Sequence, residues 1–223
     1  MKYVIHTYPK RLWYVKDYIV RDMINQGIKN EDIIILNDKH KIGNLQAFVE
    51  SCKILNEDSW HLQDDVLLSS KFRDKTEVLG RLNMIVSGFC CYEFNEGATL
   101  CNGFTTAKFL YMTFPCIFIP LRYMKDFVNW FYLESTQVRF KDKIDTKKND
   151  DLLFYAFLME RHKKDEIYNC KECLVDHVDY LIGGSLVNKE RGLTKATYWN
   201  ETELNKKLES RLKNDKNILS IHW

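Results

Sequence analysis

The segment W-H-L-Q-D-D-V-L-L, from Trp60 to Leu68, decides how the rest of this chain is interpreted. It places two adjacent aspartates, Asp64 and Asp65, between two apolar runs, which is typical of a buried strand that ends in paired acids. Two neighbouring carboxylates repel each other and strands disfavour Asp, and a divalent cation bound by both acids offsets these costs. The segment therefore predicts a metal site. The alternative is a solvated turn whose acids cap the following element.

Strands and helices alternate in the sequence before this segment. Apolar runs at 3–7 and 32–38 have the character of buried strands, and each is followed by helical spacing, which ends at Gly27 in the first case and covers 43–55 in the second. A third strand is expected at 59–63. This alternation predicts a parallel sheet covered by helices, and ligands bind such sheets beyond the carboxyl ends of the strands.

The second half of the sequence loses this regularity and predicts a mixed α/β region. Strands are expected within 83–91, 99–104 and 116–119, and Pro120 opens a helix. An apolar helix at 152–161 follows Asn149-Asp150-Asp151, where Asp150 or Asp151 is suited to act as the N-cap. A late segment, Leu174-Val175-Asp176-His177, precedes the glycine pair Gly183-Gly184. A charged helix is expected at 201–216.

Size and composition indicate one globular domain with a C-terminal appendage. The chain has 223 residues, of which 45% are hydrophobic and 29% charged, and its net charge of +2 demands no polyanionic partner. We expect one α/β domain over 1–195, divided into a nucleotide-binding half at 1–80 and an acceptor half at 81–195. The remaining residues, 196–223, form a helical appendage.

The sequence predicts a cytoplasmic protein without a membrane anchor. No signal peptide is visible after Met1, and the longest apolar region, 109–121, is interrupted by two prolines and is shorter than the ~20 residues that span a bilayer. Seven cysteines in no regular framework favour reduced thiols. Cys170 and Cys173 have the spacing of half a zinc site, but no second pair completes it, so ordinary thiols are expected.

Taken in order, these features resemble those of a small nucleotide-sugar glycosyltransferase of the GT-A fold, over about the first 190 residues. The resemblance implies a Rossmann-like nucleotide-binding half and a mixed central sheet flanked by helices. It implies that Asp64 and Asp65 occupy the place of the D-x-D motif and, with His177, hold Mn²⁺ or Mg²⁺ on the diphosphate of the donor. It further implies a general base in the acid pair at the helix start, with Asp151 as the first choice and Asp150 as the second.

The same resemblance implies a donor site at the strand ends. His6 and Thr7 would border the nucleotide, Asp38 would contact the base or ribose, and Asp64 would lie beside the diphosphate. Lys189 and Arg191, which follow the glycine pair, would close over the diphosphate. Turn chemistry and ordinary surface charges are the alternatives for these residues.

The chemistry explains why these residue types are needed. A nucleoside-diphosphate sugar loses its diphosphate during transfer, and a divalent ion stabilises the charge that develops on this leaving group. Oxygen ligands and one imidazole suit Mn²⁺ or Mg²⁺. The signature H-x-x-G-x-x-K-P-W of one retaining group does not follow His177, which favours an inverting displacement assisted by a carboxylate base.

The acceptor is a hydroxyl of either a soluble glycan or small molecule, or of a hydroxymethylated base in DNA, as for some phage enzymes. The second class is suggested by a basic run from Arg139 to Lys148 that follows the aromatic residues Trp130, Phe131 and Tyr132. A solvated lysine-rich loop explains the same run. Two other functions stay open: a non-catalytic nucleotide- or sugar-binding module, and a nucleotidyltransferase.

Overall fold

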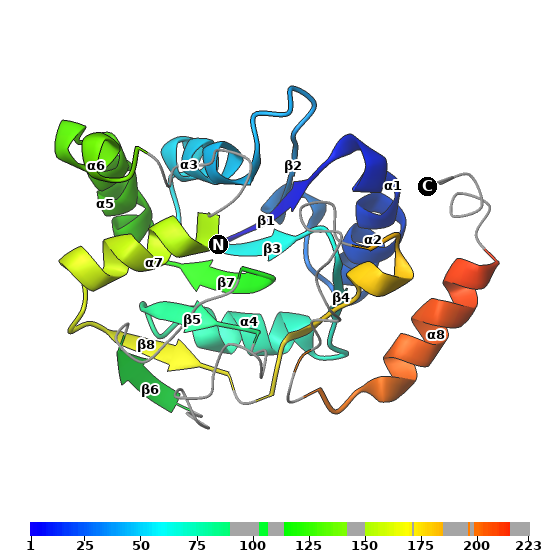
Figure 1. Cartoon of the computed structure of the whole chain (residues 1–223). Coiled ribbons are helices and arrows are strands. Elements are labelled where there is room, and N and C mark those ends of the chain that lie inside the picture. The colour runs from blue at the N-terminus through cyan, green and yellow to red at the C-terminus, as the bar shows by residue number, and fades with distance from the viewer. Residues whose placement is uncertain are drawn as a thin grey trace.

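A mixed seven-stranded sheet with helices on both faces forms the body of the protein, and a separate two-stranded ribbon lies beside it (Figure 1). The computed structural model of the chain describes residues 1–89, 103–106, 114–141, 150–170, 172–184, 196 and 199–214. Its strands are β1 (Lys2–Thr7), β2 (Ile33–Asn37), β3 (Ser59–Gln63), β4 (Val66–Leu68), β5 (Ile85–Ser87), β6 (Gly103–Thr106), β7 (Cys116–Ile119), β8 (Glu166–Asn169) and β9 (Val175–His177).

The strand order in the large sheet is β2-β1-β3-β7-β5-β8-β6. β1 pairs in parallel with β2 on one side and with β3 on the other, so the carboxyl ends of these three strands lie at one edge. β7 then joins β3 in the antiparallel direction. The α/β class with a mixed central sheet flanked by helices, predicted from the sequence, is confirmed.

A continuous helical segment follows β1. It consists of α1 (Leu12–Tyr14), a π-helical stretch (Val15–Val20) and α2 (Arg21–Asn25), with helical dihedral angles at both junctions. The other helices are α3 (Asn44–Ile54), α4 (Phe72–Gly80), α5 (Leu121–Phe131), α6 (Glu134–Arg139), α7 (Asp150–Arg161) and α8 (Thr202–Lys213).

The sheet separates two hydrophobic cores. Along β1, Tyr3 and Ile5 enter the core formed with the α1–α2 segment, α4 and α8, while Val4 enters the core formed with α3, α5 and α7. This alternation follows from the period of two in a strand. In the second core the rings of Phe48 and Phe154 lie 5.6 Å apart, and burial of each such side chain contributes about 1.5–3 kcal/mol.

Several local expectations differ from the structure. β2 was expected to be buried, but all five of its residues are only partly buried because it is an edge strand. The sequence patterns also missed α4, α6, β4 and β8 as separate elements. α4 is a polar helix that buries only Phe72 and Thr76, so its apolar periodicity is weak.

The described cysteines Cys52, Cys116, Cys170 and Cys173 are all buried. A membrane-crossing helix, long and apolar enough to span a bilayer, does not occur in the part of the chain that the structure describes.

Candidate metal and donor site

The two-stranded ribbon brings Asp65 and His177 together. β4 begins immediately after Asp65 and pairs in the antiparallel direction with β9, with Val66 opposite His177. The backbone N–H of Val178 donates to the carbonyl of Asp65 at 2.8 Å, which extends the pairing by one residue. The predicted neighbours therefore meet through backbone pairing between segments that are distant in the sequence.

Asp65, His177 and Asp179 form a buried group whose candidate ligand atoms all lie within 4.8 Å of one another. Oδ1 of Asp65 lies 3.3 Å from Nε2 of His177, and Oδ1 of Asp179 lies 3.4 Å from Nδ1 of the same ring. The three residues are 8%, 3% and 4% exposed. Two carboxylates thus flank one imidazole in a site with little access to bulk water.

The chemistry of this group suits a divalent metal ion. Oδ1 of Asp65 is buried and, among the described residues, makes no hydrogen bond of ordinary geometry. A buried carboxylate oxygen without a hydrogen-bond donor is costly, and a cation removes the cost. Carboxylate oxygens together with an imidazole nitrogen are suitable ligands for Mn²⁺ or Mg²⁺.

Asp179 was not among the residues predicted for the site. It begins a short 3-10 turn, Asp179–Leu181, directly after β9. The available signal was the spacing D-H-V-D from Asp176 to Asp179, which places an acid on each side of His177. Of these two acids Asp176 is directed elsewhere, because its Oδ2 accepts a hydrogen bond from Nδ2 of Asn205 on α8 at 2.6 Å.

Asp64 has a different environment from its neighbour Asp65. Its Oδ2 accepts hydrogen bonds from Oγ1 of Thr7 at 2.9 Å and from the backbone N–H of Tyr8 at 3.2 Å. Its Oδ1 accepts from Nη1 of Arg11 at 2.9 Å. Both carboxylate oxygens are therefore bound by protein groups, and Asp64 fastens the end of β1 to the end of β3.

Arg11 is a site residue that the sequence patterns did not indicate. It ends the 3-10 turn Pro9–Arg11 after β1 and is only 4% exposed. Its Nη1 also donates to Oδ2 of Asp65 at 2.6 Å, and its Nη2 donates to the carbonyl of Gly184. One guanidinium thus connects both acids of the pair with the glycine turn.

The pKa values of the two acids shift in opposite directions. Burial raises the pKa of Asp64, and Arg11 offsets this only in part. Burial also acts to raise the pKa of Asp65, but His177 and Arg11 outweigh it and hold that pKa below its ordinary value. Asp65 is therefore the more readily ionised of the two acids, which suits a metal ligand.

The remaining strand-end residues predicted to contact the donor make internal hydrogen bonds. The carboxylate of Asp38 accepts from the backbone N–H groups of Ile42 and Gly43, each at 2.8 Å, and so closes the loop between β2 and α3. The hydroxyl of Thr7 is directed to Asp64, as described above. These contacts hold both side chains beside the carboxyl edge of the sheet.

His6 lies in a buried hydrogen-bonded chain between β1 and β3. Its ring stacks on that of His61, with Nε2 of His6 3.1 Å from Nδ1 of His61. Nε2 of His61 is in turn 2.9 Å from Oγ of Ser59. Burial lowers the pKa of His6 to about 4, so both groups of this pair are neutral near pH 7.

Asp150, at the start of α7, lies close enough to Tyr8, the residue after β1, for its charge to act on the Tyr8 hydroxyl. Helix α7 begins at Asp150, so Asp150 and Asp151 lie in its first turn. Burial and the neighbouring charge of Asp151 raise the pKa of Asp150 to about 7. After burial, the charges of Asp38, Asp150 and Asp64 all contribute to raising the pKa of Tyr8 to about 12.

Tyr8 is thus affected both by acids at the strand ends, Asp38 and Asp64, and by Asp150 on α7. It follows β1 directly, and its hydroxyl donates to Oδ1 of Asn44 at the start of α3. Oδ1 of Asp151 accepts from the backbone N–H of Leu152 at 2.7 Å. Backbone N–H groups of the same helix start also act on the carboxylate of Asp150, but burial and the charge of Asp151 outweigh them.

Some predicted residues fall outside the described ranges, and others lie in the core. Lys189 and Arg191 are not among the described residues, nor are the lysines at 143, 147 and 148. Trp130 and Phe131, suggested above as stacking residues, are 3% and 4% exposed and pack in the core. Arg139 from the basic run pairs with Glu160 at 2.6 Å.

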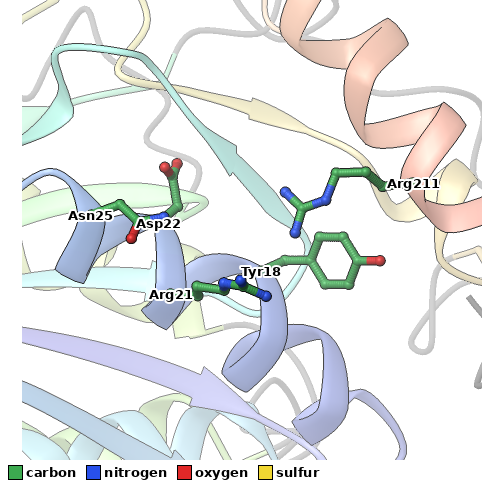
Figure 2. Close-up of a pocket in the computed structure, with 5 residues that line it drawn as sticks. All are labelled: Tyr18, Arg21, Asp22, Asn25 and Arg211. Carbon is green, nitrogen blue, oxygen red and sulfur yellow. The ribbon is translucent and has the colours of Figure 1, made fainter.

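A separate pocket of about 320 Å³ lies where the α1–α2 segment meets α8 (Figure 2). Figure 2 shows Arg211 extending from α8 over the ring of Tyr18, and its guanidinium carbon lies 4.5 Å from the ring centroid. Asp65, His177 and Asp179 do not line this pocket. The lining residues are Tyr18, Arg21, Asp22, Asn25 and Arg211.

Solved structures that resemble this chain include two crystal structures of LgtC. One is an active-site mutant of LgtC, 12% identical to this chain, covering 76% of this chain and 72% of its own, with a TM-score of 0.45. The other is galactosyltransferase LgtC in complex with donor and acceptor sugar analogs, 11% identical, covering 95% and 96% of the two chains, with a TM-score of 0.48.

No protein-family model matches the sequence, and no curated protein matches it either. The likeness to LgtC is a loose one, with both TM-scores below 0.5. The function proposed below therefore rests on the residues of this chain.

Proposed function

We propose that the protein is a metal-dependent glycosyltransferase that moves a sugar from a nucleoside-diphosphate sugar to an acceptor hydroxyl with inversion. The observation that carries this proposal is the buried group of Asp65, His177 and Asp179 beside the carboxyl ends of β1 and β3. This is the edge at which open α/β sheets bind nucleotides. Asp150, at the start of α7 and within electrostatic range of Tyr8 after β1, would supply a base.

Asp65, His177 and Asp179 are proposed to hold Mn²⁺ or Mg²⁺. When bound there, the ion supplies positive charge to the diphosphate leaving group. Asp64 is assigned a supporting role in this proposal, because its two oxygens are already bound by Thr7, Tyr8 and Arg11. It keeps the end of β3 in place, so that Asp65 reaches His177.

Asp150 is proposed as the general base that takes the proton of the acceptor hydroxyl. A base works best when its pKa lies near the working pH, and the pKa of Asp150 is raised to about 7. The sequence favoured Asp151 over Asp150. The order is reversed here because the pKa of Asp150 is raised to a value that suits a base, and the charge of Asp151 helps to raise it.

A hydroxyl of a soluble glycan or small molecule is proposed as the acceptor in preference to a modified DNA base. Stacking of an extruded base requires exposed aromatic rings; of the three aromatic residues that suggested DNA, Trp130 and Phe131 are buried in the core and Tyr132 alone is exposed, at 49%. An assay with labelled sugar nucleotides and hydroxymethylated DNA tests this preference. Strong labelling of the modified DNA, absent from plain DNA, would reverse it.

The central experiment measures metal-dependent binding of nucleoside diphosphates by calorimetry. The wild-type protein is titrated with UDP, GDP and ADP, each with and without Mn²⁺, and the variant Asp65→Asn is compared with it. We expect the wild type to bind a nucleoside diphosphate more tightly with Mn²⁺ than without it. Asp65→Asn should weaken this Mn²⁺-dependent binding by at least about tenfold, because the substitution removes the charge of one metal ligand. Asp17→Asn, a change at an exposed acid on the first helix, serves as the matched control.

Equal Mn²⁺-dependent heats for Asp65→Asn and the wild type would remove the metal assignment. Turnover then separates the enzyme classes that use such a site. Release of a nucleoside diphosphate from a sugar nucleotide supports glycosyl transfer, whereas release of pyrophosphate from a nucleoside triphosphate would point to a nucleotidyltransferase. Binding without any turnover would indicate a binding module.

A further inference from the structure

Arg11 already neutralises part of the negative charge at the site. Its Nη1 lies 2.9 Å from Oδ1 of Asp64 and 2.6 Å from Oδ2 of Asp65, and all three residues are buried. Two buried carboxylates this close together require a positive partner. The guanidinium is therefore the cation on the acid pair when no other cation is bound.

The two carboxylate oxygens of Asp65 face different partners. Oδ2 accepts from Arg11, whereas Oδ1 faces His177 at 3.3 Å and accepts no hydrogen bond of ordinary geometry from the described residues. A metal ion held by Oδ1 would thus share one carboxylate with the guanidinium. Positive charges on opposite oxygens of one buried carboxylate repel each other strongly, because screening in the interior is weak.

Arg11 is also incompletely satisfied where it lies. Its Nε is buried and has no acceptor among the described residues. A buried N–H group without an acceptor costs free energy, so the guanidinium has capacity for a further anionic partner. A diphosphate group has several negative oxygens. It can accept a hydrogen bond from this donor, and its charge offsets the repulsion between the metal ion and the guanidinium.

We propose that Arg11 is the resident counter-cation of the site and makes the binding of the metal ion and of the nucleoside diphosphate interdependent. Metal alone binds weakly, since Arg11 has already compensated the acid pair. Diphosphate alone binds weakly, since Asp64, Asp65 and Asp179 repel it. Together they balance the charges of the acids and the guanidinium. This role rests on the proposed function, and it makes Arg11 a positioning residue for the donor.

The contact to Gly184 gives this arrangement a fixed geometry. Nη2 of Arg11 donates to the Gly184 carbonyl, and Gly183 and Gly184 have φ values of 105° and 75°. Side chains rarely adopt such left-handed conformations, so glycine is required to turn this carbonyl towards the guanidinium. Arg11 is therefore held from three directions, by one carbonyl and two carboxylates.

The test measures Mn²⁺ affinity by electron paramagnetic resonance, with and without saturating UDP or GDP. In the wild type we expect the nucleotide to tighten Mn²⁺ binding by at least about tenfold. Arg11→Gln removes the charge, so it should bind Mn²⁺ alone about tenfold more tightly than the wild type and lose most of the coupling. Arg11→Lys keeps the charge and should stay close to the wild type. Lys10→Gln, at the exposed neighbouring position, is the control for net charge.

Weaker or unchanged Mn²⁺ binding by a folded Arg11→Gln protein would overturn the inference. Should this variant fail to fold, the wild-type protein still decides, because independent binding of Mn²⁺ and nucleotide would overturn it equally. The proposed function fails separately. If no sugar nucleotide is turned over while the coupling and the tighter Mn²⁺ binding of Arg11→Gln are observed, the transferase assignment falls and the role of Arg11 stands.

Discussion

Adjacent identical residues have unequal roles at this site. Asp64 is bound by three protein donors and has a raised pKa, whereas Asp65 keeps one buried oxygen that faces the His177 ring and has a lowered pKa. The two residues form the turn between β3 and β4, which directs Asp64 to the end of β1 and Asp65 to His177, while Arg11 contacts both.

The acid pair of α7 supports a prediction on pH dependence. Transfer requires the ionised form of Asp150, so kcat/KM should rise as the pH increases towards about 7 and level off above it. Asp150→Asn should lower the rate by about 10²–10⁴ without loss of donor binding. Steady-state kinetics across the pH range, with calorimetry of donor binding, measure both effects.

Asp151→Asn is the matched control for this prediction. It removes a neighbouring negative charge that raises the pKa of Asp150, so the acidic limb of the profile should move to lower pH while transfer persists. The opposite result, in which Asp151→Asn loses transfer and Asp150→Asn retains it, would return the base to Asp151.

The sequence predicted individual acids better than their partners. Asp64, Asp65 and His177 could be singled out because acids at a strand end and a late histidine form recognisable patterns. Arg11 could not, because a basic residue after Pro9 looks like ordinary surface charge until the fold buries it. Asp179 was missed since its proximity to Asp65 depends on the pairing of β4 with β9.

Pairing of β1 with β3 creates a pH-sensitive contact in the core. The pKa of His6 falls from 6.5 to about 4, so the folded protein excludes a proton that the unfolded chain binds below pH 6.5. Folding stability should therefore be retained above pH 6.5 and be lost as the pH falls towards 4. The contribution of His6 is about 2–3 kcal/mol.

The variant His6→Gln isolates this contribution, because an amide can replace the hydrogen bond to His61 but does not titrate. Urea unfolding at pH 7 and pH 4.5 should show a smaller loss of stability for His6→Gln than for the wild type. His40→Gln changes an exposed position and should lose as much stability between pH 7 and pH 4.5 as the wild type does. Equal losses for all three proteins would exclude His6 as the source.

Elements with strong apolar periodicity were predicted well. β1, β3, α3, α5 and most of α7 lie where the hydrophobic pattern places them. α4 and β8 were missed because tertiary contacts with the sheet, and not a local pattern, stabilise short or polar segments. The antiparallel direction of β7 was likewise beyond local patterns, since it depends on the route of the chain between elements.

The whole molecule should be stabilised by the ligands proposed here. Residues of the site come from the ends of β1, β3 and β9, so ligand binding requires the folded chain. At ligand concentrations about 100-fold above Kd, stabilisation is about 2.7 kcal/mol, which corresponds to a rise in Tm of about 5–10 °C. Differential scanning fluorimetry with Mn²⁺ plus UDP or GDP measures this rise, and Asp65→Asn should abolish it.

The hydrogen bond between Arg11 and Gly184 joins residues 173 positions apart. Such a closure forms only after nearly the entire polypeptide has collapsed, and loops of this size are entropically slow to close. A nascent chain emerging from the ribosome would present its acid pair long before the partner turn is synthesised. During that interval Arg11, which precedes the acid pair in the sequence, lacks the carbonyl that later fixes its position.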